Sequence, residues 1–228
     1  MKPLLEVQGL YSGYLGIPVL SGVDLDVQAG EFLGVFGHNG MGKTTLLRTI
    51  MGEVKTQRGS IQFDQRPIHG LPVARRAKMG LGYVPQGRRI YADLTVRENL
   101  KMAALAVRAA SSMVDEVVDS LPRLRPILDR IGGVLSGGEQ QILALGRCLV
   151  SNPRMILLDE PTEGIQPSIR DEIIDVLHGL RKQRELTIIL VEQNLNFLEA
   201  LVDRLVVLQK GVVRTDIQVS DLANLLAG

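Results

Sequence analysis

A glycine-rich loop followed by a lysine and two threonines carries the clearest chemistry in this sequence. Its residues 37–44 fit the pattern G-x-x-x-x-G-K-[ST]. Glycines let a backbone curl so that its N–H groups point inward at oxygens, and a following helix N-terminus adds partial positive charge. Lys43 can place a full charge near the terminal phosphates, and the Thr44 hydroxyl can bind Mg2+. The loop therefore predicts a triphosphate site formed by Gly37, His38, Asn39, Gly40, Met41, Gly42, Lys43, Thr44 and Thr45.

Two adjacent carboxylates, Asp159 and Glu160, follow the apolar run 155–158. The run predicts a buried strand, and ligands of α/β sheets bind at the carboxyl ends of their strands. Successive side chains of a strand point in opposite directions, so the two acids should do different work. We expect Asp159 to hold Mg2+ and Glu160 to polarise the water that attacks a γ-phosphate.

A capping box, formed by Ser136 and Glu139, begins a helix predicted to run to residue 151. Gly137 and Gly138 lie between the two capping residues. A capped helix N-terminus opened by glycines can bind an anion. The loop at 37–44 already provides for phosphate, so this second helix end needs its own explanation, unless it is only a structural cap.

Buried strands alternate with helices around these motifs. This alternation is typical of a mainly parallel sheet covered on both faces. Strands are predicted at 32–36, 81–84, 155–158 and 186–191, and helices at 43–51, 72–79 and 168–182. Short strands with tight turns predict an antiparallel sheet beside this core, from residues 4–10, 19–27 and 59–64, and a hairpin from 205–209 and 212–215. Ser220 is expected to cap a last short helix.

Residues 92–135 contain no evident strand. Thr95 and Glu98 form another capping box, which predicts a helix to about residue 107, and a second helix is expected over 112–121. We therefore expect a helical lobe, about 92–150, inserted in an α/β core, with residues 1–228 forming a single domain.

Composition excludes several classes of protein. The net charge is +1, which argues against a nucleic-acid partner. The pairs Arg75–Arg76 and Arg88–Arg89 are expected on a solvated surface. A single cysteine, Cys148, cannot form an intrachain disulfide and is expected to be a small buried hydrophobe in a reducing compartment.

Membrane and metal patterns are also missing from the sequence. The start of the chain lacks the apolar region of a signal peptide, and no apolar stretch approaches the roughly 18 residues of a membrane span. Any membrane role is therefore expected to come through a partner. The three histidines, at 38, 69 and 178, lack metal-ligand spacing.

Residues 135–141 match the signature of the ATP-binding cassette (ABC) family almost letter for letter, and they lie shortly before the strand that ends on Asp159 and Glu160. With the glycine-rich loop, they make the whole chain resemble that family. The resemblance implies a P-loop α/β cassette with an antiparallel β subdomain and an inserted helical lobe. It also implies ATP and Mg2+ as cofactors, and hydrolysis of ATP. Two cassettes would pack head to tail, and each would close its signature residues over the ATP bound by the other. In this chain the signature residues are Ser136, Gly137, Gly138 and Glu139.

Further residues resemble family positions. Gln86 looks like the glutamine that contacts Mg2+ or water and senses the membrane partner. Tyr14 looks like the aromatic residue that stacks on adenine, and Tyr11 is a weaker candidate for that role. Either tyrosine could instead be a partly buried residue that only packs against its neighbours.

Two departures from the family pattern stand out. Gln193 occupies the place of a histidine found in many cassettes; its amide can donate a hydrogen bond to a γ-phosphate but cannot become cationic. A polar residue that merely ends a strand is an equal alternative for Gln193. Gln166 stands where many cassettes carry an aspartate.

The sequence resembles one branch of importers within the family. Residues 83–90 and 191–194 are similar to the ATPase subunits of branched-chain amino acid importers, and 162–169 to those for urea and short-chain amides. The resemblance implies a peripheral protein on the cytoplasmic face of the inner plasma membrane. Its partners would be a second cassette, identical or related, two transmembrane permease subunits and, indirectly, a solute-binding protein. The rival interpretations are a non-transport cassette and a P-loop kinase of a small metabolite.

Overall fold

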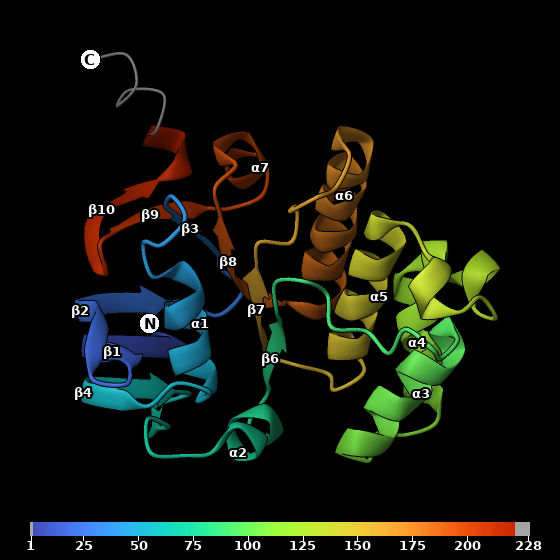
Figure 1. Ribbon diagram of the computed structural model, residues 1–228, viewed down its shortest axis with the longest axis horizontal. Helices are drawn as coiled ribbons and strands as arrows, with labels where there is room; N and C mark the ends of the chain where they lie inside the picture. Colours follow the sequence, from blue (N-terminus) through green and yellow to red (C-terminus); the bar gives the residue numbers. More distant parts are fainter. Residues whose placement is uncertain (1, 222–228) are drawn as a thin grey trace.

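A six-stranded sheet forms the centre of the molecule (Figure 1). The computed structural model describes residues 2–221. The strand order is β10-β9-β3-β8-β7-β6, and only the pairing of β10 with β9 is antiparallel within these residues. The strands are β3 (Phe32–Phe36), β6 (Leu81–Val84), β7 (Met155–Asp159), β8 (Thr187–Glu192), β9 (Arg204–Gln209) and β10 (Val212–Gln218).

Both faces of this sheet are buried, as its unbroken apolar runs predict. On β8, Ile188 and Leu190 face one hydrophobic cluster, whereas Ile189 and Val191 face another. The first cluster is shared with the helices α5 (Gly137–Leu149) and α6 (Pro167–Arg184), and the second with α1 (Lys43–Met51). Figure 1 shows α1 on one side of the sheet and α5 and α6 on the other.

An antiparallel sheet packs on the other side of α1. Its order is β2-β1-β4-β5, with β1 (Leu5–Tyr14), β2 (Ile17–Val27), β4 (Thr56–Phe63) and β5 (Arg66–Pro67). Strand β1 extends four residues beyond the predicted end at 10, because a register shift between Val7 and Leu10 lets pairing continue. Gly9 lies in that shift with φ of 50°, a conformation that suits glycine. The predicted combination of a mainly parallel sheet with an antiparallel one is confirmed.

Helices occupy residues 96–149 almost throughout, at one end of the molecule (Figure 1). They are α3 (Val96–Val107), α4 (Ser112–Ser120), the 3-10 turns η1 (Pro122–Ile127) and η2 (Gly132–Val134), and α5. Both predicted capping boxes are present, at Thr95–Glu98 and Ser136–Glu139. The assignment of this region as a lobe inserted in a single domain stays a prediction.

The remaining helices are α2 (Val73–Lys78) and α7 (Leu195–Glu199). Helix α7 was not predicted, because five residues are too few to show a helical period. Arg76 on α2 contradicts its expected surface position: it is 2% exposed, whereas its neighbour Arg75 is exposed. Most of the helix predicted from Ser220 onward lies outside the described residues. Within residues 2–221, no helix combines the length and apolar character needed to cross a membrane.

Candidate active site

The glycine-rich loop joins β3 to the N-terminus of α1. Gly40 and Gly42 have φ of 78° and 102°, and a Cβ atom on Gly37 would lie 2.6 Å from the carbonyl oxygen of Leu208. Gly42 is also the N-cap of α1 and offers no side chain to its free N–H groups. The loop thus presents backbone donors and a helix dipole at one point, which is the environment an anion requires.

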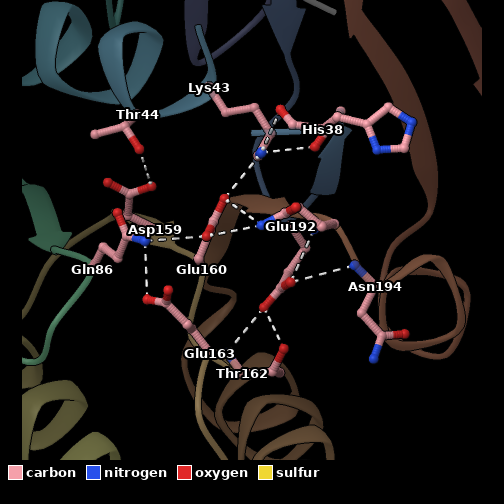
Figure 2. A network of polar contacts seen from close by, with 12 residues as sticks. His38, Lys43, Thr44, Gln86, Asp159, Glu160, Thr162, Glu163, Glu192 and Asn194 are labelled. Carbon is pink, nitrogen blue, oxygen red and sulfur yellow. Dashed lines mark hydrogen bonds and ion pairs between the residues drawn. The ribbon is translucent and has the colours of Figure 1, made fainter. Parts of the chain in front are cut away.

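Lys43 brings the only full positive charge among the residues that line this loop's hollow. Its side chain is 3% exposed, and its Nζ donates hydrogen bonds to the carbonyl oxygens of Gly37 at 2.7 Å and His38 at 3.2 Å. The same Nζ lies 2.9 Å from Oε1 of Glu160 (Figure 2). His38 contributes its backbone here, while its imidazole is directed away from Lys43.

Asp159 lies at the carboxyl end of β7, opposite the first turn of α1. Its Oδ1 accepts a hydrogen bond from the Thr44 hydroxyl and its Oδ2 one from the Tyr83 hydroxyl, each at 2.9 Å. Burial raises the pKa of Asp159 above its usual range, despite these two donors. The carboxylate and the Thr44 hydroxyl are the hard oxygen ligands that Mg2+ prefers, so these residues fit that ion.

Glu160 is surrounded by donors from three other segments. Besides Lys43, the Gln86 amide donates to Oε2 at 3.2 Å, and the Gln193 amide lies 3.3 Å from both carboxylate oxygens. Only 7% of Glu160 is exposed. Gln86 also donates to Glu163 at 2.9 Å. The structure thus brings together the acid, the lysine and both glutamines that were expected to act in catalysis.

The signature residues lie elsewhere. They form the N-terminus of α5, where the Ser136 hydroxyl accepts from the Glu139 N–H and the Glu139 carboxylate accepts from the Ser136 N–H. A Cβ atom on Gly138 would meet Ile169 of α6 at 2.2 Å, and one on Gly137 would meet Arg88 at 2.9 Å. None of these four residues lines the hollow beside the glycine-rich loop, so within one chain the two predicted anion sites stay apart.

Tyr14 also lies outside the central cluster, at the end of β1. It is 42% exposed. Tyr11 is 38% exposed, but the Arg58 guanidinium stands over its ring at 6.0 Å. This partial cover favours Tyr14 as the ring open to a ligand, and its role stays a prediction.

Sequence reasoning missed three residues of the cluster. Tyr83 binds Asp159, Glu163 binds Gln86, and Glu192 binds the loop after Glu160. Tyr83 and Glu163 are close in sequence to predicted residues, but nothing local indicated their partners. Cys148 was expected to be buried but is only partly so; it packs against the core, and burial raises its thiol pKa to about 12, so the thiol is protonated at neutral pH.

Two hollows of the described surface compete as candidate sites. The larger, about 810 Å3, lies between α2 and the C-terminal end of α3. Its lining among the described residues includes five alanines, two methionines and the cations Lys78, Arg108 and Arg154, but no acidic residue. The hollow beside the glycine-rich loop is about 360 Å3, and Lys43, Thr44, Gln86 and Glu160 all line it. The smaller hollow is the better candidate, because Lys43 and Glu160 line it together with the glycine-rich loop and its free backbone donors.

Comparisons with known proteins agree with this geometry. Residues 20–163 match the family described as ABC transporter. The chain is 40% identical over 203 residues to the high-affinity branched-chain amino acid transport ATP-binding protein BraG of Pseudomonas aeruginosa, covering 88% of this chain and 87% of the relative. It is 36% identical over 197 residues to the lipopolysaccharide export system ATP-binding protein LptB of Haemophilus influenzae, covering 84% and 80%.

Solved structures show the same fold. The cbiO1 protein of Clostridium perfringens, part of the ABC transporter complex cbiONQ, superposes with a TM-score of 0.88 at 24% identity, covering 98% of this chain and 92% of that one. An ATP-binding subunit of an ABC transporter superposes with a TM-score of 0.83 at 26% identity, covering 98% and 93%.

Proposed function

Because this chain belongs to the ABC transporter family, as a subunit that binds and hydrolyses ATP, we propose that it powers an importer of branched-chain amino acids or of urea and short-chain amides. The identity to BraG, a branched-chain amino acid transport subunit, supports the first substrate class. The lower identity to LptB, an exporter subunit, makes the direction of transport part of the proposal. The observation that carries the chemistry is the convergence of Lys43, Asp159 and Glu160 at one edge of the sheet.

The glycine-rich loop would hold the phosphates of ATP. Its free N–H groups, the α1 dipole and the Lys43 ammonium fit a triphosphate, and the close approach of Gly37 to Leu208 leaves no room for a side chain. Tyr14 would stack on the base. When bound, ATP supplies the phosphoanhydride bond whose hydrolysis releases the energy for transport.

Thr44, Asp159 and Gln86 would hold Mg2+ through oxygen atoms. The ion would supply positive charge for the phosphate oxygens. Burial raises the pKa of Asp159 because it removes the charged carboxylate from water. A cation beside the carboxylate would offset this loss of solvation.

Glu160 would act as the general base for the attacking water. Lys43 now pairs with it at 2.9 Å, and this ammonium has to turn from the carboxylate to reach a phosphate. Gln86 and Gln193 would then hold Glu160 from two sides, each through a neutral amide that does not compete for the proton.

Other chains would complete the machine. We infer that a second cassette, identical or related, presents its Ser136–Glu139 helix end to the phosphates bound here, because these residues lie outside the cluster of their own chain. Two permease subunits would bind the cassettes at the cytoplasmic face of the inner plasma membrane, and a solute-binding protein would deliver cargo to them. No nucleic-acid partner is proposed.

The proposal is tested with Glu160→Gln in the chain purified with its membrane partners and reconstituted in vesicles. We expect ATP binding to persist while hydrolysis falls about 10²- to 10⁴-fold, the usual contribution of a general base. ATP-driven uptake of labelled leucine, valine or urea should stop with it. The exposed Glu185→Gln serves as the control.

Two results would contradict the proposal. Wild-type hydrolysis in Glu160→Gln would remove Glu160 from the chemistry. Vesicles that hydrolyse ATP without accumulating any of these solutes would remove the substrate assignment. Phosphate release without any added acceptor distinguishes this activity from that of a metabolite kinase.

A further inference from the structure

Glu192 is a buried carboxylate for which sequence analysis predicts no role. It is the last residue of β8, and 4% of it is exposed. Its Oε1 accepts hydrogen bonds from the Thr162 N–H at 2.9 Å and from the Thr162 hydroxyl at 2.6 Å. Its Oε2 accepts from the N–H groups of Gln193 at 3.0 Å and Asn194 at 3.4 Å (Figure 2). One carboxylate therefore joins the end of β8 to the loop that follows β7.

The loop it holds begins with a strained residue. Glu160 has φ of 46°, in the left-handed region that side chains rarely adopt. Such a conformation persists only where the surroundings enforce it. Backbone hydrogen bonds from Glu160 to Val191 at 3.0 Å and from Glu163 to Glu160 at 3.2 Å hold the turn from within the main chain. The bonds between Glu192 and Thr162 are the side-chain part of that restraint, two residues beyond Glu160.

We propose that Glu192 is a positioning residue for ATP hydrolysis, which fixes the turn after β7 so that the Glu160 carboxylate stays in place. The inference rests on the proposed role of Glu160 as general base. Glu192 acts on Glu160 by two routes. It holds the turn through Thr162, and it orders the backbone N–H of Gln193, whose amide lies 3.3 Å from the Glu160 oxygens.

The donors around Glu192 explain why a carboxylate is needed. All four partners donate, so both oxygens must accept. A glutamine has the same shape but turns an NH2 group toward one pair of donors. Glu192→Gln therefore breaks the hydrogen bonds at one of the two side-chain positions without leaving a cavity.

The experiment measures steady-state hydrolysis and nucleotide affinity in the full chain with its membrane partners. We expect Glu192→Gln to lower kcat about tenfold to a hundredfold, as small misplacements of reacting groups do. KM and the affinity for ATP should stay within about twofold, because the phosphate-binding loop is untouched. The exposed Glu199→Gln on the neighbouring α7 is the matched control and should behave as wild type.

Thr162 tests the same contact from the other side, also in case Glu192→Gln fails to fold. Thr162→Val removes the hydroxyl bond and should lower kcat, and Thr162→Ser should restore it. The double variant should lose no more than Glu192→Gln alone, because both changes break one interaction.

The outcomes separate this inference from the proposed function. If Glu160→Gln is inactive but Glu192→Gln and Thr162→Val keep wild-type kcat, the positioning role is wrong and the general base stands. A loss of ATP affinity equal to the loss of kcat, or additive losses in the double variant, would also overturn it. If Glu160→Gln keeps wild-type activity, the proposed function itself fails.

Discussion

Asp159 shows how a residue that serves the site can weaken the fold. Its pKa is raised mainly by burial, so the folded state binds its proton more tightly than the unfolded state does. Between the ordinary pKa and the raised one, the unfolded state loses the proton first, and the free energy of unfolding falls as pH rises. Above that window, the buried charge is a constant cost.

We therefore predict that Asp159→Asn stabilises the protein at neutral pH in the absence of nucleotide and divalent cations. The amide keeps the shape and can still bind Thr44 and Tyr83. Thermal unfolding should show a Tm higher by a few degrees, given that about 1 kcal/mol shifts Tm by roughly 2–4 °C in a domain of this size. The gain should shrink in acid, as Asp159 becomes protonated in the wild type.

The same variant should lose the Mg2+-dependent part of nucleotide binding. Asp129→Asn, at a side chain that is 90% exposed, should change neither stability nor binding. A Tm at pH 7 below that of the wild type would show that the negative charge of Asp159 contributes to folding, against this expectation.

Arg76 links two elements, α2 and the C-terminal end of α1. Its guanidinium donates to the carbonyl oxygens of Thr49 at 2.8 Å and Ile50 at 2.6 Å, at the end of the helix that begins at the glycine-rich loop. It also donates to Leu71 and His69. Burial lowers the pKa of Arg76 to about 10, which still leaves it cationic at neutral pH and well placed against the negative end of the helix dipole.

We predict that Arg76→Met costs about 2–4 kcal/mol in the free energy of unfolding, because several buried carbonyl oxygens lose their donors. Urea unfolding measures the loss, and Arg75→Met is the control because it removes a neighbouring exposed charge. Arg76→Lys should fall between the two, as an ammonium cannot reach all four carbonyl groups. Equal stability of the Arg75 and Arg76 variants would show that these hydrogen bonds contribute nothing.

At the same scale, the elements show what a sequence can and cannot predict. Both capping boxes and the glycine-rich loop were found because their partners lie within a few residues of one another. Arg76 was misplaced because its burial is decided by α1, 26 residues earlier. Glu192 and Thr162 are 30 residues apart and meet only because β7 and β8 are neighbours in the sheet.

The same limit applies to the site. Asp159 and Glu160 could be predicted from an apolar strand that ends on two acids. Two of their donors come from other parts of the sheet, Tyr83 from β6 and Gln193 from the residue after β8, and no local pattern specifies which side chains of neighbouring strands will meet. Residues that act through chemistry were therefore easier to predict than residues that hold them.

For the whole molecule, the decisive feature is the separation of the two helix ends that we propose to bind phosphate. The N-terminus of α1 lines the hollow that also holds Glu160, whereas Ser136 and its neighbours at the N-terminus of α5 do not line it. If each working site combines the loop of one chain with the signature of another, a chain with a damaged loop can still supply its signature. A chain with a damaged signature can likewise still supply its loop. Lys43→Ala damages only the loop, and Ser136→Arg only the signature.

We predict that each variant alone is nearly inactive and that mixing them restores ATP hydrolysis. A mixed dimer has one intact site, formed by the loop of the Ser136→Arg chain and the signature of the Lys43→Ala chain. If the two chains pair at random, half of the dimers are mixed, and about a quarter of the wild-type rate should return if the two sites work independently.

Wild-type activity per chain should also rise with protein concentration. Ser112→Arg, at an exposed serine of α4, is the control and should be active alone. No recovery on mixing, or a rate per chain independent of concentration, would place the whole reaction within one chain.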